Sequence, residues 1–129
     1  MANVHAWYAN STIQDAPTFS FDFFKGNGPD LASLVPNKPR MYMTEVGWQT
    51  NSSVPVPVAS ASRASVENLQ YFLNNLVYTA NTREVKYIYY EYMNIPWKEQ
   101  RWPGVGGFWG LFNSNKTLKA ITLQDCSHD

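Results

Sequence analysis

The fold is decided by residues 41–48, which read Met41-Tyr42-Met43-Thr44-Glu45-Val46-Gly47-Trp48. A turn over residues 36–39, with a proline at each end, comes directly before this stretch. Residues 40–44 have the composition of a good strand, and Glu45 follows them at once. The stretch therefore places a carboxylate at the end of a strand.

Two further segments precede this strand. Residues 2–8 predict a strand that begins almost at the first residue. Residues 16–25 allow two interpretations, because the alternation of Phe19, Phe21 and Phe23 has the period of a strand. An Ala-Pro start and a Gly-Asn-Gly stop suit a short helix instead. The position of the segment between two better strands favours the helix.

The clearest helix is predicted over residues 60–81, with Ser62 or Ser65 as a candidate cap. Its apolar positions fall on one helical face, and they are Leu69, Phe72, Leu73, Leu76 and Val77. The prolines in residues 49–60 predict a loop before it. Residues 84–92 predict a third strand. Its side chains are almost continuously bulky, so we expect other parts of the protein to cover both of its faces. Residues 94–112 predict a loop, and residues 115–123 a short closing helix.

The predicted order of strand, helix, strand, helix, strand gives an α/β fold in which crossovers allow parallel pairing. The 129 residues suit a single domain, 1–129. Three parallel strands leave two open sheet edges, which makes a poor sheet by itself. The chain is then either an open α/β layer or part of a (β/α)8 barrel, which usually needs about 250 residues.

The composition limits the classes of function. The formal net charge is +0 and no run of like charges occurs, which argues against nucleic acid as a partner. No apolar run is long enough for a transmembrane helix. Aromatic residues make up 16% of the chain, which favours a heavy core over a sugar-binding groove. The single cysteine, Cys126, has no partner for an internal disulfide, and we expect a free thiol there.

Four stretches resemble motifs of glycoside hydrolase family 17, in particular its fungal β-1,3-glucanase and glucan transglycosylase branch. They are residues 3–9 (Asn-Val-His-Ala-Trp-Tyr-Ala), 41–48, 89–98 (Tyr-Tyr-Glu-Tyr-Met-Asn-Ile-Pro-Trp-Lys) and 107–113 (Gly-Phe-Trp-Gly-Leu-Phe-Asn). The resemblance implies a (β/α)8 barrel, of which this chain would supply the C-terminal half with the sixth, seventh and eighth strands. It also implies a β-1,3-glucan substrate and no cofactor or metal.

The resemblance places Glu45 at the position of the catalytic nucleophile in a retaining mechanism, which needs a second carboxylate roughly 5 Å away. The family's acid/base glutamate follows an Asn, and no Asn-Glu pair occurs in this sequence. Asn94 and Ile95 also stand where the family has carboxylates, whereas Glu91 keeps the family type. Glu91 is the second catalytic candidate; the implied substrate-binding residues are His5, Tyr8, Trp48, Trp97 and Lys98.

Alternatives remain for each of these residues. Glu45 is either a nucleophile or a carboxylate that holds Lys98 or a tyrosine hydroxyl. Glu91 lies on an apolar strand, so it should pair with Lys98 or a tyrosine, in a structural or a substrate-binding role. For His5 a core position is the safer interpretation.

Two functional classes follow. One is a split glucan hydrolase or transglycosylase, completed when two copies form a homodimer and Glu91 of one copy faces Glu45 of the other. The other is a lectin-like glucan-binding protein without turnover. Three Asn-X-Ser/Thr triplets, at residues 10, 51 and 115, hint at a secreted or cell-wall location.

Overall fold

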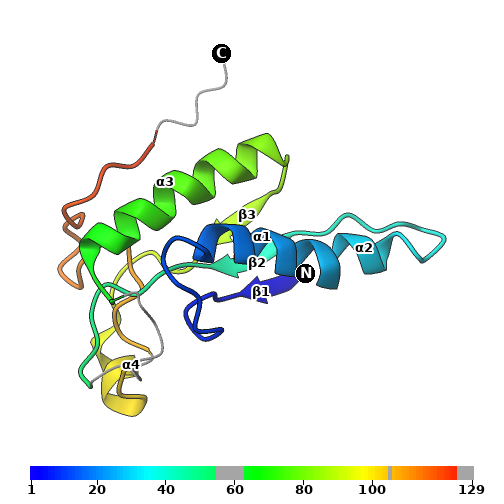
Figure 1. The fold of residues 1–129 in the computed structure, drawn as a ribbon. Coiled ribbons are helices and arrows are strands. Elements are labelled where there is room, and N and C mark those ends of the chain that lie inside the picture. The colour runs from blue at the N-terminus through cyan, green and yellow to red at the C-terminus, as the bar shows by residue number, and fades with distance from the viewer. Residues whose placement is uncertain (55–62, 105, 125–129) are drawn as a thin grey trace.

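A computed structural model of the chain describes residues 1–54, 63–104 and 106–124. Three short strands and four helices follow one another along this part of the chain (Figure 1). In chain order they are β1 (Ala2–Val4), α1 (Ala16–Asn27), α2 (Pro29–Ala32), β2 (Met43–Val46), α3 (Val66–Thr82), β3 (Tyr87–Tyr89) and α4 (Pro96–Arg101).

The strands form one parallel sheet in the order β1-β2-β3. The predicted parallel α/β arrangement of three strands is therefore confirmed, although each strand is shorter than predicted. Val4 pairs with Val46, and Val46 pairs with Tyr89, so these three residues lie in one row across the sheet. Because side chains alternate along a strand, the residue before each of them points to the opposite face.

Helix α1 settles the open interpretation of residues 16–25 in favour of the helix. A proline stands in its first turn, where the missing N–H costs nothing. Phe21 and Phe24 are buried with helical spacing. Phe19 and Phe23, four residues apart, stack on each other with ring centroids 5.8 Å apart. The alternating phenylalanines thus serve two sides of a helix rather than one face of a strand.

Helix α3 begins at Val66, later than the predicted start at residue 60. Ser65 is the cap, because its Oγ accepts a hydrogen bond from the Asn68 N–H at 3.0 Å. Ser62 lies outside the described residues, as do the predicted loop residues from 55 to 60. The predicted apolar face is confirmed at Leu69, Phe72, Leu73 and Leu76, which are buried, whereas Val77 is only partly buried.

Two predictions for the C-terminal part are wrong. Helix α4 lies inside the predicted loop 94–112, and it begins with Pro96 at a position where a proline is preorganised for a helix. Residues 115–123 form no helix, because the Asn115 side chain accepts hydrogen bonds from the N–H and hydroxyl of Thr117. Phe112 instead bridges Met93 on one side and Leu118 on the other.

The two long helices cover one face of the sheet (Figure 1), where α1 packs against β1 and against α3. Val4, Met43 and Val46 are the buried residues of strands β1 and β2. On the other face the Ile88 side chain is 62% exposed. The prediction that the third strand is covered on both sides is therefore wrong for the described residues, and the exposed face carries apolar surface.

Candidate active site

The carboxyl ends of the three parallel strands lie at one edge of the sheet, and they bring together residues that are far apart in the sequence. His5 follows β1, Glu45 lies near the end of β2, and Glu91 follows β3 by two residues. Asn3 pairs with Glu45 in the sheet register. In parallel α/β folds this edge is where binding and catalytic sites are built.

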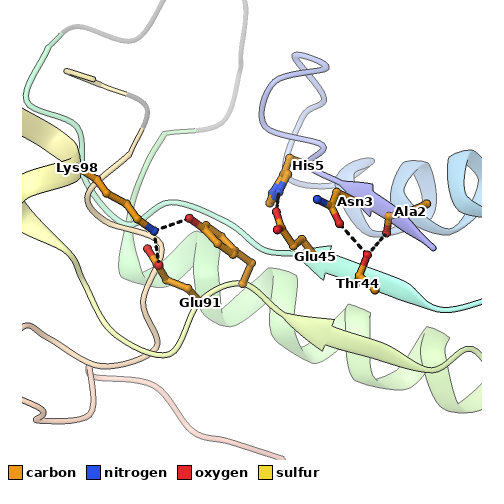
Figure 2. A network of polar contacts seen from close by, with 8 residues as sticks. Ala2, Asn3, His5, Thr44, Glu45, Glu91 and Lys98 are labelled. Atoms are coloured by element: carbon orange, nitrogen blue, oxygen red, sulfur yellow. Dashed lines mark hydrogen bonds and ion pairs between the residues drawn. The ribbon is translucent and has the colours of Figure 1, made fainter. Parts of the chain in front are cut away.

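Glu45 contacts His5 across the first two strands (Figure 2): His5 Nε2 lies 3.1 Å from Glu45 Oε2. The Glu45 side chain is 38% exposed and the His5 side chain 16%. The imidazole is held edge-on by the Trp109 ring, at a centroid distance of 5.0 Å, and by Tyr90, at 5.5 Å. His5 thus fixes one carboxylate oxygen of Glu45 while the group remains accessible to a ligand.

Glu91 forms an ion pair with Lys98, as predicted: Lys98 Nζ lies 2.6 Å from Glu91 Oε2 (Figure 2). The same ammonium donates to the Tyr90 hydroxyl at 2.6 Å. The side chains of Glu91 and Lys98 are only 11% and 17% exposed. Burial alone would lower the pKa of Lys98, but its hydrogen bonds with Glu91 and Tyr90 outweigh burial and raise that pKa.

These contacts bear on one of the alternatives for Glu45, the pairing with Lys98. Lys98 pairs with Glu91, and the described contact of the Glu45 side chain is with His5. The interpretation of Glu45 as a carboxylate that holds Lys98 is therefore wrong. His5, in turn, is partly buried and joined to Glu45, so it belongs to the site as well as to its packed wall.

The predicted sugar-binding aromatic residues differ in exposure. Tyr8 is 57% exposed, and its ring packs against Trp109 with centroids 5.7 Å apart. Trp97, on α4, is 59% exposed. Both residues are largely exposed, and the Tyr8 ring lies 5.9 Å from the ring of His5.

Trp48 requires a correction, because its side chain is fully buried. Its ring packs edge-on against Trp7, with centroids 5.1 Å apart, and stacks on Phe72 at 5.8 Å. Trp48 is thus a core residue that joins the strand end to α3, and it presents no ring face to a sugar in this structure.

Sequence analysis missed a polar cluster behind Glu91. Lys119, only 6% exposed, donates to Thr50 Oγ1 at 2.6 Å and to Asn94 Oδ1 at 2.9 Å. Burial lowers the pKa of Lys119 to about 8, although the charge of Glu91 raises it. The Asn94 oxygen thus faces a buried ammonium rather than the sheet edge. The one sequence signal for this cluster was Asn94, an amide at a position where the resemblance implies a carboxylate.

The segment 109–112 runs beside the chain that follows β3. The Leu111 N–H donates to the Glu91 carbonyl at 3.0 Å, and the Phe112 N–H donates to the Tyr92 carbonyl at 3.0 Å. Asn94 N–H donates in turn to the Phe112 carbonyl at 2.9 Å. This pairing holds Trp109, which is buried at 1% exposure, against His5 and Tyr90 as the wall of the site.

Neither a metal site nor a membrane span is found in residues 1–54, 63–104 and 106–124. No three His, Cys, Asp or Glu side chains of these residues gather as they would around a metal ion. None of the described helices combines the length and apolar character needed to cross a bilayer.

A parallel α/β sheet with two glutamates at its carboxyl edge is compatible with a glycoside hydrolase built on a (β/α) barrel. Residues 1–110 match the family model of the BtgE/BtgC glycoside hydrolase domain. The chain belongs to this family. The resemblance to fungal glucan-processing glycoside hydrolases is thereby confirmed.

Curated relatives carry glucanase names. The chain is 27% identical over 137 residues to btgC of Aspergillus niger, named a glucan endo-1,3-beta-glucosidase, and the match covers 98% of this chain. It is 24% identical over 140 residues to the btgC protein of Aspergillus flavus, which bears the same enzyme name. The chain spans 20% of the length of each of these relatives.

Solved structures support the fold. A glycoside hydrolase family 17 β-1,3-glucanosyltransferase from Rhizomucor miehei superposes with a TM-score of 0.76 at 22% identity. The match covers 93% of this chain and 41% of that enzyme. An active-site mutant of the Rhizomucor miehei β-1,3-glucanosyltransferase, in complex with laminaritriose, gives a TM-score of 0.75 at 20% identity. The chain therefore has the fold of part of a (β/α) barrel.

Proposed function

We propose that this chain provides the nucleophile of a retaining site that processes β-1,3-glucan, and that Glu45 is this nucleophile. The observation that carries the proposal is the position of Glu45. Its carboxylate lies at the carboxyl edge of a parallel sheet, is oriented by His5 and remains 38% exposed, within the stretch that matches the glycoside hydrolase family. The names of the relatives support β-1,3-glucan as the substrate.

In the proposed reaction a carboxylate oxygen of Glu45 attacks the anomeric carbon of the sugar, and the bond to the leaving oxygen breaks. The leaving oxygen takes a proton from a general acid. A glycosyl ester of Glu45 results, which water or a hydroxyl of a second glucan then displaces. The bond from His5 to Oε2 leaves the other oxygen of Glu45 for the attack.

Glu91 is suited to a different role within a single copy. Its Oε2 accepts a hydrogen bond from Lys98 Nζ at 2.6 Å, and a carboxylate in an ion pair accepts hydrogen bonds and donates none. Glu91 and Lys98 together offer an acceptor and a donor to sugar hydroxyls near Glu45. The general acid must therefore come from outside the pair as it stands in one copy.

Self-association is the proposed source of that acid. Within the described residues β1 and β3 form the two edges of the sheet, and open edges invite pairing. Half of an eight-stranded barrel needs four strands. The segment 109–112 adds a fourth extended segment to the three strands, beside the end of β3. A second copy would then bring its Glu91 toward Glu45. For that glutamate to donate a proton, its ion pair with Lys98 has to open.

The experiment compares the wild type with Glu45→Gln on β-1,3-linked oligosaccharides, with new reducing ends and longer products as the readouts. The glutamine keeps the size of the side chain and removes the nucleophile. We expect turnover to fall by a factor of at least about 10³, the scale seen when a catalytic group is removed. Glu67→Gln, an exposed glutamate of α3, is the matched control and should keep wild-type turnover. Equal turnover in Glu45→Gln and the wild type would contradict the proposal.

A second candidate function is glucan binding without turnover. It is favoured by the ion pair that holds Glu91. Saturable binding of the oligosaccharides, with no products from the wild type or from Glu45→Gln, would select this function. In both cases the ligand is a β-glucan, and we propose a secreted or cell-wall location on that ground alone.

A further inference from the structure

Two exposed tryptophans belong to helix α4 and its end, since Trp97 lies within the helix and Trp102 directly follows it. Trp97 is 59% exposed and Trp102 is 50% exposed, and their ring centroids lie 6.1 Å apart with the ring planes tilted by 53°. The other tryptophans, Trp7, Trp48 and Trp109, are 7%, 0% and 1% exposed. The pair therefore stands apart from the tryptophans of the core.

The loops around this pair are tied together by Glu99, a carboxylate of α4 that is only 7% exposed. Its Oε1 accepts hydrogen bonds from the Ser53 N–H at 2.9 Å, from the Ser53 hydroxyl and from the Gly104 N–H at 2.7 Å. Its Oε2 accepts from the Gly107 N–H at 3.0 Å. Burial alone would raise the pKa of Glu99, but these bonds outweigh burial and lower it to about 2.

The backbone of the tied loop is specific to glycine at two positions. Gly104 has a φ of +81°, a region that favours glycine. A Cβ on Gly107 would lie 2.4 Å from the Glu99 Cβ, so the loop approaches α4 as closely as a glycine permits. The Trp102 N–H donates to the Lys98 carbonyl at 2.8 Å, which fixes the backbone of the second tryptophan to α4. The two rings are thus presented by a fixed piece of backbone.

The pair is continuous with the candidate active site. Lys98 lies between Trp97 and Glu99 in α4, and its ammonium reaches Glu91 and Tyr90 at the sheet edge. Helix α4 therefore links the tryptophan pair to the lysine that reaches the sheet edge. A pyranose has C–H faces that pack on flat rings and a rim of hydroxyls that stays in water. Because the two rings are tilted against each other, their faces suit successive sugars of a curved chain better than they suit a flat ligand.

We propose that Trp97 and Trp102 form a sugar-stacking platform, which binds a β-1,3-glucan chain beyond the sugars at Glu45, with Glu99 as the residue that positions it. This inference rests on the proposed glucan ligand. It adds Trp102 and Glu99 to the site, and it assigns binding at the platform to ring faces rather than to charge.

Tryptophan fluorescence tests the platform directly, in a Glu45→Gln background where no turnover interferes. Because Trp7, Trp48 and Trp109 are buried, acrylamide should quench Trp97 and Trp102 selectively. We expect laminaritriose and longer β-1,3-linked oligosaccharides to protect these two residues from the quencher, with a saturable dependence on concentration. Longer oligosaccharides should bind more tightly, because they reach the platform and the sheet edge together.

Variants assign the protected residues by affinity, measured by calorimetry. Trp97→Ala and Trp102→Ala should each weaken the binding of the longer oligosaccharides about tenfold, and Trp→Phe at either position should retain most of the affinity. Tyr78→Ala removes an aromatic side chain that is 71% exposed on α3, and it should leave the affinity unchanged. Glu99→Gln should weaken binding and make both tryptophans easier for acrylamide to quench.

The outcomes separate this inference from the proposed function. Unchanged affinity in the double variant Trp97→Ala/Trp102→Ala would overturn the platform, as would a wild type that binds no oligosaccharide. Turnover that depends on Glu45 would stand in the first case, because it is read from products, whereas a wild type that binds no oligosaccharide would contradict the proposed function as well. If the platform binds oligosaccharides while Glu45→Gln keeps full turnover, the role of Glu45 as nucleophile is contradicted and the platform is supported.

Discussion

Lys119 is a buried ammonium whose described acceptors are neutral. It donates to the Thr50 hydroxyl, to the Asn94 amide oxygen and, at 3.5 Å, to the Phe108 carbonyl. Burial lowers its pKa from the ordinary 10.5 to about 8, with the charge of Glu91 acting in the opposite direction. Between pH 8 and 10.5 the unfolded chain therefore holds a proton at this lysine that the folded chain has released.

Stability should accordingly rise with pH through that window, since the unfolded state binds more protons there. We predict that Lys119→Met removes this contribution. The free energy of unfolding in urea, compared between the variant and the wild type from pH 7 to 9.5, should show the wild type gaining relative to the variant as pH rises. Parallel pH profiles of the two proteins would mean that folding does not lower the pKa of Lys119.

Sequence reasoning at the residue scale succeeded where a contact was required by chemistry. A glutamate on an apolar strand has to be paired or hydrogen-bonded, and Lys98 was one of the two predicted kinds of partner, which the structure shows to be the one that Glu91 uses. It failed for Trp48, because a tryptophan just past a strand end can turn to either side of the sheet. The direction is set by Trp7 and Phe72, which come from elements far away in the sequence.

At the scale of elements, helix α4 and its loops depend on Glu99. The carboxylate joins residue 53 to residues 104 and 107, so it connects two loops to the helix. Its pKa of about 2 lies below the ordinary 4.5. A lowered carboxylate pKa means that the stabilisation is complete above about pH 4.5 and is lost as pH falls toward 2.

We predict that Glu99→Gln is destabilised at pH 7 and that the difference from the wild type shrinks as pH falls from 4.5 toward 2.5. Urea unfolding followed by tryptophan fluorescence at several pH values measures this. Glu67→Gln on the surface of α3 is the control for the loss of a negative charge, and it should run parallel to the wild type. A constant difference between Glu99→Gln and the wild type across the acid range would show that the charge of Glu99 contributes nothing.

Helix α4 also shows why element prediction fails in this region. The six residues Pro96–Arg101 are too few for a periodic pattern, and the Gly- and Trp-rich sequence around them is typical of a loop. Helix α3, with 17 residues and a long apolar face, was predictable for the opposite reason. Residues 115–123 had the composition of a short helix, but local side-chain hydrogen bonds at Asn115 competed successfully with it.

At the scale of the whole molecule, one face of the sheet is covered by α1 and α3 and the opposite face is open at Ile88. The number and order of strands could be predicted, because two crossovers with helical sequence imply parallel pairing. What lies against the open face could not be predicted, since no local pattern in the sequence specifies a second copy. Ile88 is 62% exposed on this face, so a substitution there can test whether a second copy covers it.

If two copies complete the barrel, a charged side chain at position 88 should prevent the two copies from associating. Ile88→Lys places an ammonium on the open face of edge strand β3, where a partner strand or face would have to bury it. We predict a dimer for the wild type in sedimentation velocity at micromolar concentration, a monomer for Ile88→Lys with unchanged far-ultraviolet circular dichroism, and loss of turnover together with dimerisation. Tyr78→Lys, on the exposed side of α3, should remain a dimer and remain active. A wild type that sediments as a monomer would reject self-association. Turnover by that monomer would show that the acid does not come from a second copy.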